Sequence, residues 1–358
     1  MKPEKELPDH FLSAIRTVAP GTVIREGIES VLRAKTGGLL VLGDSPEVKG
    51  LVEGGFEINS PVSARKIYEL AKMDGAIILD EKGESIWKAN AQLVPQSGIF
   101  SEETGIRHRI AERVARQTGA LVIAISQRRS LITVLKGPVK YVLPDLSLIL
   151  TKANQAIQTL EKYRSVLERV LVNLSIQEFE DVVTVLDVSK VIQRVEMVKR
   201  IIHELDFYLA LLGSEGQLVN MQMEELTTNV HEEAQLVLLD YVDTEPKNLD
   251  QINKNLRSLG WEDLLELTVI SRILGYGNTF SSLDMAVSPK GFRILNKLSR
   301  MPFNIVENLI RFFGSLQKII AATIEELDQV EGIGEIRAKA IKNGLLKLRE
   351  QVLLDRHF

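Results

Sequence analysis

The sequence contains no cysteine. A chain without thiols forms no disulfide, no cysteine-ligated zinc or iron–sulfur centre and no thiol nucleophile. It also has no apolar run near the roughly 20 residues that a membrane-spanning helix requires. The first ten residues, MKPEKELPDH, lack the apolar core of a signal peptide. These absences fit a cytoplasmic protein without a membrane partner.

Three common catalytic motifs are missing as well. The chain has neither a Walker P-loop nor a G-x-G-x-x-G dinucleotide fingerprint, which argues against P-loop ATPases and nicotinamide-dependent oxidoreductases. No G-x-S-x-G elbow is present, and serine, histidine and aspartate are not spaced as a hydrolase triad. Any nucleotide chemistry must therefore use another arrangement of residues.

Charge is unevenly distributed along the 358 residues. The whole chain carries a formal net charge of −4, whereas residues 290–358 contain 12 lysines and arginines against 8 acidic residues. The length exceeds what one hydrophobic core usually organises, so two or three domains are expected. A basic segment behind an acidic body is typical of a nucleic-acid-binding tail domain.

Residues 1–146 alternate between helical and strand patterns and are expected to form one α/β nucleotide-binding domain. Ser63 is a helix N-cap and Gly119 a helix C-cap in this prediction. Continuous apolar strands point to a mixed sheet covered by helices on both faces. The predicted helices are 15–18, 24–34, 64–73 and 105–117, and the predicted strands are 38–42, 76–79, 85–94, 121–125, 131–135 and 139–143.

Helical spacing takes over after residue 146. Residues 147–240 contain no proline, and apolar residues such as Ile157, Leu160 and Leu167 recur at helical intervals. We expect an all-α middle domain at 147–288 that acts as a spine or linker without chemistry of its own. A second all-α domain is expected at 289–358.

The C-terminal domain contains a helix-hairpin-helix pattern built on Gly332, Ile333 and Gly334. Two glycines let backbone N–H groups approach a DNA phosphate without an intervening side chain. Arg337 and Lys339 follow on the second helix, and we expect these five residues to contact DNA. Residues 301–303, Met-Pro-Phe, occupy the place of a partner hairpin, which the proline makes structural because it has no N–H to donate.

Asp74 precedes Gly75 and Ala76 at the start of a predicted strand. A carboxylate there is a ligand for Mg²⁺ or Mn²⁺, which prefer oxygen donors. Gly75 would leave room for a nucleotide against the backbone. The alternative is an ordinary turn aspartate between a helix and a strand, which is common.

A basic cluster lies thirty residues further on, at the predicted start of a helix. Thr104 and Gly105 lead into Ile106, Arg107, His108, Arg109 and Ile110. Helix N-termini offer free N–H groups and a positive dipole end, so added arginines and histidine favour phosphate binding. The alternative is a solvated charged face beside Glu102, Glu103 and Glu112. No second histidine stands at metal-binding spacing, which argues against zinc.

Further candidates lie nearby in the predicted sheet. Ser126, Arg128 and Arg129 form a turn after an apolar strand, where they can close over a triphosphate or simply be solvated. Leu93 is a candidate base contact, although a core leucine is the strong alternative.

Taken together, these residues resemble the DNA-integrity scanning family of bacterial diadenylate cyclases over essentially the whole length. The resemblance is carried by Asp74–Gly75–Ala76, by Thr104–Gly105 with Arg107–His108–Arg109, by the helical segment LTKANQAIQTLEKY, and by the terminal hairpin. It implies condensation of two ATP into cyclic di-AMP with release of pyrophosphate. A divalent metal, branched DNA such as Holliday junctions and a nucleoid-associated homo-octamer are also implied.

The resemblance also assigns roles. Asp74 would hold the metal, and Arg107, His108 and Arg109 would join it as catalytic residues that offset phosphate charge. Two sites would face each other across a two-fold axis, because each chain offers one nucleotide site. The family usually has threonine where this chain has Ile110, so one hydrogen bond to phosphate would be missing. Two other functions stay open, namely a non-enzymatic oligomeric DNA-binding protein and a different metal-dependent nucleotidyltransferase.

Overall fold

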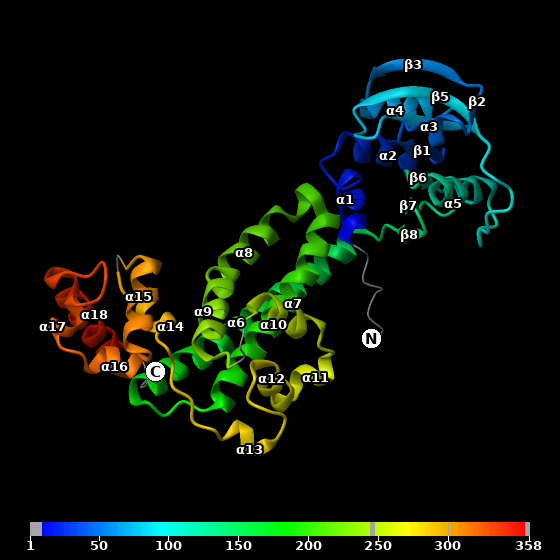
Figure 1. Cartoon of the computed structure of the whole chain (residues 1–358). Helices are drawn as coiled ribbons and strands as arrows, with labels where there is room; N and C mark the ends of the chain where they lie inside the picture. The colour runs from blue at the N-terminus through cyan, green and yellow to red at the C-terminus, as the bar shows by residue number, and fades with distance from the viewer. Residues whose placement is uncertain (1–8, 244–247, 300, 355–358) are drawn as a thin grey trace. The chain divides into compact units, whose positions relative to one another are not determined.

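The computed structural model describes residues 9–243, 248–299 and 301–354, which pack as two compact units (Figure 1). The N-terminal unit comprises residues 1–155 and 204–221, and the C-terminal unit comprises residues 156–203 and 222–358. Residues 204–221 therefore pack with the N-terminal unit, although they follow a long helical stretch in sequence. The division into sections 1–146, 147–288 and 289–358 stays a prediction.

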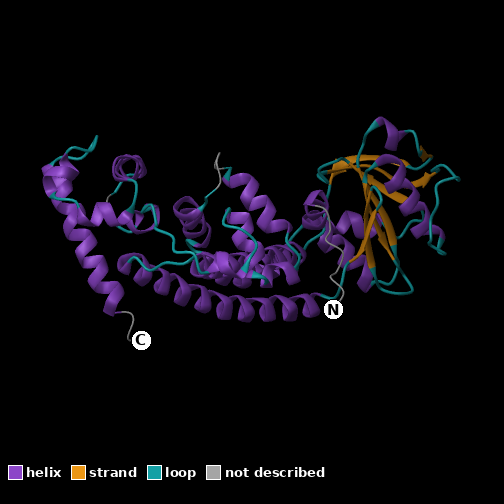
Figure 2. Ribbon diagram, turned by 60° about the horizontal axis from the view of Figure 1, so that its bottom comes forward, coloured by secondary structure: helices purple, strands orange, loops and turns teal. Residues whose placement is uncertain are grey.

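An eight-stranded mixed sheet forms the centre of the N-terminal unit (Figure 2). The order is β2-β5-β4-β1-β6-β7-β8, with β3 also paired to β5. Strands β1 and β4 run parallel, and the other pairs run antiparallel. The strands are β1 (Gly38–Leu42), β2 (Val52–Glu53), β3 (Phe56–Pro61), β4 (Ala76–Leu79), β5 (Ser85–Leu93), β6 (Leu121–Ile125), β7 (Ile132–Lys136) and β8 (Val139–Val142).

Helices cover both faces of this sheet, as predicted. Leu39 and Val41 pack in one core with Val114 of α5. Side chains alternate along a strand, so Leu42 points to the opposite face, where it lies close to Ile24 of α2 beside Gly83. The helices of this domain are α1 (Asp9–Thr17), α2 (Val23–Arg33), α3 (Pro46–Lys49), α4 (Ala64–Leu70) and α5 (Ile106–Thr118).

Local sequence signals account for several helix ends. The Ser63 hydroxyl accepts a hydrogen bond from the Lys66 amide, 3.3 Å away, and so caps α4 as predicted. Gly119 ends α5 in the left-handed region with φ of 71°. Strands β2 and β3 and the short helix α3 were not predicted, because glycine and proline break the apolar pattern there.

Two long helices open the helical part of the chain, which continues to Leu354, the last described residue. Helix α6 covers Leu146–Glu180 and α7 covers Val185–Leu212. They are followed by the 3-10 turn η1 (Gly213–Gly216), α8 (Gln217–Thr227), α9 (Val230–Tyr241), α10 (Leu249–Ser258), α11 (Trp261–Leu265), α12 (Leu267–Leu274) and α13 (Phe280–Leu283). The last helices are α14 (Phe292–Asn296), α15 (Phe303–Phe313), α16 (Leu316–Ala321), α17 (Ile324–Asp328) and α18 (Glu335–Leu354).

A buried polar network joins α14 to α6 and α9 in the C-terminal unit. The fully buried Arg293 guanidinium forms an ion pair with Glu178, also fully buried, and donates to the Ser175 hydroxyl at 2.9 Å. Tyr241 donates to the same glutamate at 2.7 Å. Asp240 accepts backbone N–H bonds from Gly291, Phe292 and Arg293 at 2.7–3.0 Å. Burial, together with the charge of Glu178, raises the pKa of Asp240 to about 7.

Candidate functional site

One edge of the sheet gathers the predicted catalytic segments. Strands β1 and β4 are parallel and both begin at this edge, where the antiparallel β6 ends, since Gly38 pairs with Ile125. Asp74 and Gly75 directly precede β4, and Ser126 directly follows β6. Two segments that are fifty residues apart in sequence therefore emerge at the same side of the domain.

Asp74 is exposed at this edge, and no described residue forms a hydrogen bond or ion pair with its carboxylate. Gly75 has φ of +99°, and an added Cβ would lie 2.8 Å from the backbone carbon of Asn90 and 2.9 Å from the carbonyl oxygen of Ala91. The fold thus requires glycine at 75 before any nucleotide is considered. Ala76 is fully buried and pairs with Ala91 in β5, so its side chain faces the core.

The start of α5 is an open helix N-terminus. Gly105 is its N-cap, with no side-chain cap hydrogen bond. Its φ of −80° suits any residue, and an added Cβ would approach only Nδ1 of His108, at 4.0 Å. No described residue accepts from the amides of Arg107 or His108. The glycine is therefore not required by folding, and it leaves those donors accessible.

The two arginines of the cluster lie in different surroundings. An added Cβ at Gly37, just before β1, would lie 2.7 Å from Nη1 of Arg107, which places this guanidinium at the sheet edge. Arg109 instead donates from Nη2 to the Thr104 carbonyl at 3.0 Å, and its buried Nε has no partner among the described residues. Arg107 is thus available to a ligand at the edge, while Arg109 braces the loop before the helix.

Sequence reasoning missed Lys140 on β8, which joins the same cluster. Lys140 forms an ion pair with Glu103, next to the predicted Thr104 and Gly105. Burial lowers the pKa of His108, the charges of Arg107, Lys140 and Arg129 lower it further, and Glu103 opposes them. The imidazole is therefore held toward its neutral form. Lys140 follows no local motif and meets Glu103 across 37 residues, so the sequence carries no signal for it.

The β6–β7 turn has the predicted geometry. The Ser126 hydroxyl accepts from the Arg129 amide at 3.2 Å, and the Ser126 amide donates to the Leu131 carbonyl at 2.9 Å. Arg128 and Arg129 are exposed. The serine therefore shapes the turn, and both guanidinium groups are free to meet a ligand.

The side chains of two other predicted contacts pack into the core. Leu93 is 5% exposed and lies in the cluster that also holds Val114. Ile110 is partly buried against the same cluster. Packing explains both residue types, and neither side chain belongs to the exposed edge. By contrast Ile106 is 75% exposed.

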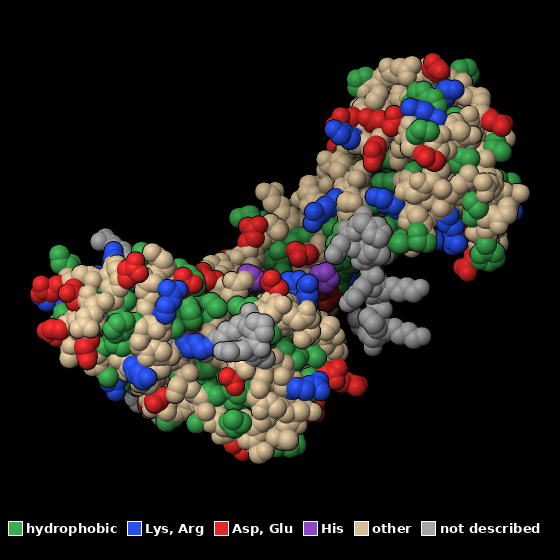
Figure 3. Space-filling view, viewed as in Figure 1, with side chains coloured by type: hydrophobic (Ala, Val, Ile, Leu, Met, Phe, Trp, Pro, Cys, Tyr) green, Lys and Arg blue, Asp and Glu red, His purple; other side chains and the backbone are tan. Residues whose placement is uncertain are grey.

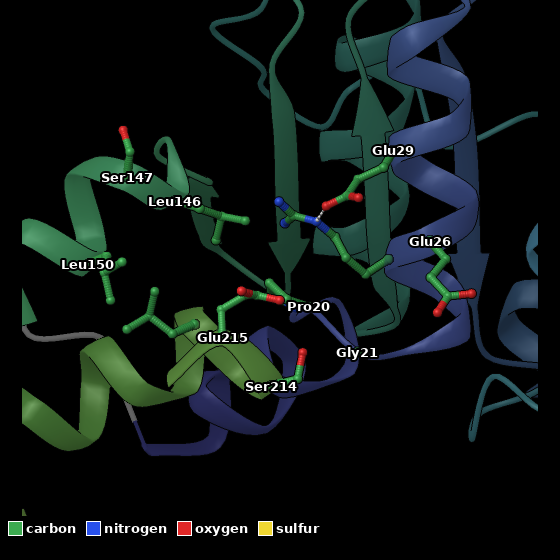
Figure 4. A pocket seen from close by; sticks show the side chains of 11 residues that line it. Pro20, Gly21, Glu26, Glu29, Leu146, Ser147, Leu150, Ser214 and Glu215 are labelled. Carbon is green, nitrogen blue, oxygen red and sulfur yellow. Dashed lines mark hydrogen bonds and ion pairs between the residues drawn. The ribbon is translucent and has the colours of Figure 1, made fainter. Parts of the chain in front are cut away.

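A cavity of about 450 Å³ elsewhere in the N-terminal unit does not suit a triphosphate (Figure 4). Glu26, Glu29 and Glu215 line it, and Arg25 is already paired with Glu29 at 2.8 Å. None of the predicted site residues lines this cavity, and the exposed edge therefore stays the predicted anion site.

The two glycines of the C-terminal hairpin differ in whether the fold requires them. Gly332 has φ of +83°, and an added Cβ would lie 2.6 Å from Cδ1 of Ile305. Gly334 has no left-handed φ, and an added Cβ would approach only Asp328, at 4.0 Å. Ile333 is 6% exposed and its amide donates to the Val330 carbonyl, so it anchors the hairpin instead of facing DNA.

The basic residues after the hairpin also differ in the partners that their side chains contact. Arg337 donates to the Gly332 carbonyl, and Lys339 lies 2.5 Å from Glu335 in an exposed pair. Lys342 donates to the carbonyls of Ile320 and Ala322 at 2.7 and 2.6 Å, which caps the end of α16. On the face drawn in Figure 3, basic and acidic side chains are interspersed over this region. The candidate anion-binding feature here is thus the hairpin backbone and not a cluster of free cations.

Pro302 lies at the N-cap of α15, and Phe303 stacks on Phe292 with ring centroids 5.9 Å apart. These contacts fit the structural role predicted for the 301–303 segment.

Comparisons with known proteins identify each part of the chain. A family model for the DisA bacterial checkpoint controller nucleotide-binding region matches residues 25–139, the model for its linker region matches 143–283, and a helix-hairpin-helix model matches 315–343. The DNA integrity scanning protein DisA of Carboxydothermus hydrogenoformans is 57% identical over 344 residues, 96% of this chain and 98% of that protein. This chain belongs to the DisA family.

Membership of the DisA family confirms the expected enzyme class, diadenylate cyclase. DisA from Clostridium botulinum strain Langeland is 52% identical over 356 residues, 99% of this chain and all of that protein. A solved double mutant of DacA from Staphylococcus aureus aligns with 38% of this chain and 91% of its own, at 19% identity and a TM-score of 0.30. Among the described residues of this DisA-family chain, no helix has the length and apolarity needed to cross a membrane.

Proposed function

We propose that this DisA-family enzyme condenses two ATP molecules into cyclic di-AMP and releases two pyrophosphates. The observation that carries the proposal is the sheet edge where the exposed Asp74 carboxylate, the open N-terminus of α5 and the Arg107 guanidinium come together. A carboxylate beside a dense anion site is what a metal-assisted nucleotidyl transfer needs.

The triphosphate would lie at the start of α5. The free amides of Arg107 and His108 and the Arg107 guanidinium would bind its oxygens, and Arg128 and Arg129 would close over the tail from the β6–β7 turn. The 3′-hydroxyl oxygen of one ATP then bonds to the α-phosphorus of the other. The bond to pyrophosphate breaks, and the hydroxyl proton passes to solvent. The chain's contribution is to position the reactants and to stabilise the leaving charge.

The described residues fit a weakly held divalent ion. They contain no group of three or more metal-binding side chains, whereas Mg²⁺ is commonly held by one or two carboxylates together with substrate phosphates. Asp74, exposed and without a partner among described residues, meets that requirement for Mg²⁺ or Mn²⁺. When bound, the ion would supply charge stabilisation at the phosphates.

A second copy of the chain would supply the second ATP. Each chain has one such edge, so ring closure requires two edges that face each other across a two-fold axis. Phe100 and Ile106, on either side of the loop before α5, are 68% and 75% exposed, which suits a surface covered by another chain. A homo-octamer with paired cyclase domains satisfies this arrangement.

The hairpin would bind branched DNA such as Holliday junctions, and DNA binding would place the enzyme at the nucleoid in the cytoplasm. Gly334 supports this because the fold does not require glycine there, while a phosphate approaching the α18 amides does. Lys339 and Arg337 lie within reach on the first turns of α18.

The decisive experiment incubates the protein with ATP and Mn²⁺ or Mg²⁺. Cyclic di-AMP and pyrophosphate in a ratio of one to two confirm the cyclase. Absence of turnover with retained DNA binding identifies a non-enzymatic DNA-binding protein, and an adduct with another acceptor identifies a different nucleotidyltransferase. The same assay with and without a four-way DNA junction tests whether the two ends are coupled, and equal rates would contradict coupling.

A further inference from the structure

Strand β5 carries an irregularity directly beside Asp74 and Gly75. Ala76 pairs with Ala91 and Ile78 pairs with Lys88, so β5 holds one more residue than β4 over this stretch. Asn90 lies inside this bulge with φ of +53°, and it is exposed. Bulges beside active sites commonly redirect a side chain.

Two glycines flank the bulge and leave the Asn90 side chain unobstructed. An added Cβ at Gly75, before β4, would meet the backbone of Asn90 and Ala91 at 2.8–3.0 Å. An added Cβ at Gly55, before β3, would meet the Ala89 carbonyl oxygen at 2.8 Å and Cα of Ala91 at 3.0 Å. The absence of a side chain at these two glycines thus allows the backbone before β3 and β4 to approach the backbone of β5 closely. No described residue forms a hydrogen bond with the side-chain amide of Asn90.

The order of strands places Asn90 opposite the phosphate-binding groups. The sheet runs β5-β4-β1-β6, so this edge presents in turn Asn90, Asp74, the Arg107 guanidinium beside Gly37, and the turn of Arg128 and Arg129. Neighbouring strands lie about 4.8 Å apart. A nucleotide laid along the edge, with its triphosphate at the arginines and its α-phosphate at Asp74, directs its base toward β5.

We propose that the Asn90 amide hydrogen-bonds the base of the bound nucleotide and selects adenine. The inference rests on the proposed nucleotide site. An asparagine side-chain amide offers a carbonyl acceptor beside an N–H donor, which complements the N6 amino group and the N7 acceptor of adenine. Guanine presents two acceptors at these positions, O6 and N7, so the Asn90 carbonyl would oppose one of them in either orientation of the amide. The side chain of Leu93, on the same strand, is buried and apolar and offers no such group.

The competing explanation is that asparagine is present only because it tolerates left-handed backbone. The chain contains its own control for this. Asn59 on β3 also has a positive φ, 44°, is also exposed, and also lies at a register shift against β5. It neighbours Ser60, which pairs with Ile86, and Ile86 pairs with Leu79 at the far end of β4. Asn59 therefore shares the backbone geometry but not the edge.

The test compares Asn90→Gly, Asn90→Ala, Asn59→Gly and the unchanged full chain. Glycine keeps the left-handed backbone and removes only the amide. Calorimetry with Mg²⁺ gives dissociation constants for the α,β-methylene analogues of ATP and GTP, which cannot react at the α-phosphate. Asn90→Gly is expected to reduce the preference for the adenine analogue about tenfold, mainly through weaker binding of that analogue, while Asn59→Gly preserves the preference.

Three results would overturn the inference. One is an Asn90→Gly protein with unchanged preference, whether or not Asn90→Ala is impaired, because this assigns the residue to backbone conformation. Another is an equal loss of affinity for both analogues, and the third is an unchanged chain that has no preference. The proposed function is tested separately by cyclic di-AMP formation from ATP. A chain that makes no cyclic product yet shows the Asn90-dependent preference would refute the cyclase and retain the base contact.

Discussion

The start of α5 and the start of α18 are two helix N-termini that are both proposed to bind phosphates, but their surroundings differ. Both follow an exposed glycine, Gly105 or Gly334, that the backbone does not require. Around α5, cationic groups converge from the helix itself, from the β6–β7 turn and from β8, and Arg107, Lys140 and Arg129 all act on His108. Around α18, Arg337 and Lys339 are engaged by Gly332 and Glu335. Under the proposed function, a triphosphate would therefore bind among concentrated positive charges, and DNA would bind mainly to backbone N–H groups with few free cations nearby.

Among the substitutions that should affect only one of the two sites, Asp74→Asn is expected to have the largest effect. Loss of the carboxylate removes a metal ligand, and the several kcal/mol that a metal contributes correspond to a fall in turnover of about a thousandfold. DNA affinity should not change. Asp44→Asn is the matched control, because Asp44 is an exposed aspartate at the opposite end of β1 with only a surface pair to Lys49. Cyclic di-AMP formation and junction binding are the measurements, and a fully active Asp74→Asn protein would remove this residue from the site.

Alanine substitutions at the glycines that folding requires should damage stability in both regions. Gly75→Ala places a Cβ against β5 backbone in left-handed geometry and should lower the free energy of unfolding by about 2–4 kcal/mol. Gly332→Ala should cost about 1–2 kcal/mol, because the end of the Ile305 side chain can move. Gly54→Ala and Gly314→Ala measure the cost of the left-handed backbone conformation alone, since both glycines have positive φ and an added Cβ would have no atom within 4 Å. Denaturant unfolding measures all four, and equal losses would show that the close contacts are unimportant.

Substitution of serine for Gly105 or Gly334, the two glycines that the backbone does not require, should impair ligand binding without impairing folding. In Gly105→Ser the hydroxyl can accept from the amide of Arg107 or His108 and so consume a donor that the phosphate needs. We expect about tenfold weaker binding of the ATP analogue, equal to about 1.4 kcal/mol, with DNA affinity and stability unchanged. Gly334→Ser should give the reverse pattern. If either substitution weakens both ligands, the two sites are coupled and the comparison fails.

Salt dependence separates the lysines near the hairpin. Lys339→Ala should reduce the slope of log affinity against log salt by about 1, as expected for a lost phosphate contact. Lys342→Ala should leave the slope unchanged and lower stability by about 1 kcal/mol, because its ammonium caps α16. An altered slope in the Lys342 variant would place that residue at the DNA interface.

The smallest effect concerns the proton on His108. Burial and neighbouring cations lower the pKa of free His108, and bound phosphates should raise it. Between the two values, ATP-analogue binding takes up a fraction of a proton, so affinity rises as pH falls through that interval. Calorimetry in buffers of different ionisation enthalpy detects the uptake. His108→Gln should abolish it, whereas His231→Gln, at an exposed position in the C-terminal unit, should not.

Local signals in the sequence predicted much of this molecule. Ser63 and Gly119 end their helices through bonds within a few residues, so their caps were predicted and are confirmed. The Glu103–Lys140 pair spans 37 residues and the Arg293–Glu178 pair spans 115, and no periodicity reports which partner a buried charge will meet. The distinction between Gly332 and Gly334 likewise depends on Ile305, which lies on another helix. Metal binding, base selection and assembly remain predictions.

The buried Arg293 network has a consequence for how this chain can be divided. Arg293 comes from α14, whereas Glu178 and Asp240 come from α6 and α9. A chain shortened to end at residue 288 would lose the guanidinium that pairs with Glu178 and the amides that satisfy Asp240. Breaking a buried pair in this way typically costs about 3–5 kcal/mol. The segment from α14 onward is therefore not separable at residue 288, and a protein engineered to end there must replace Glu178 and Asp240 as well.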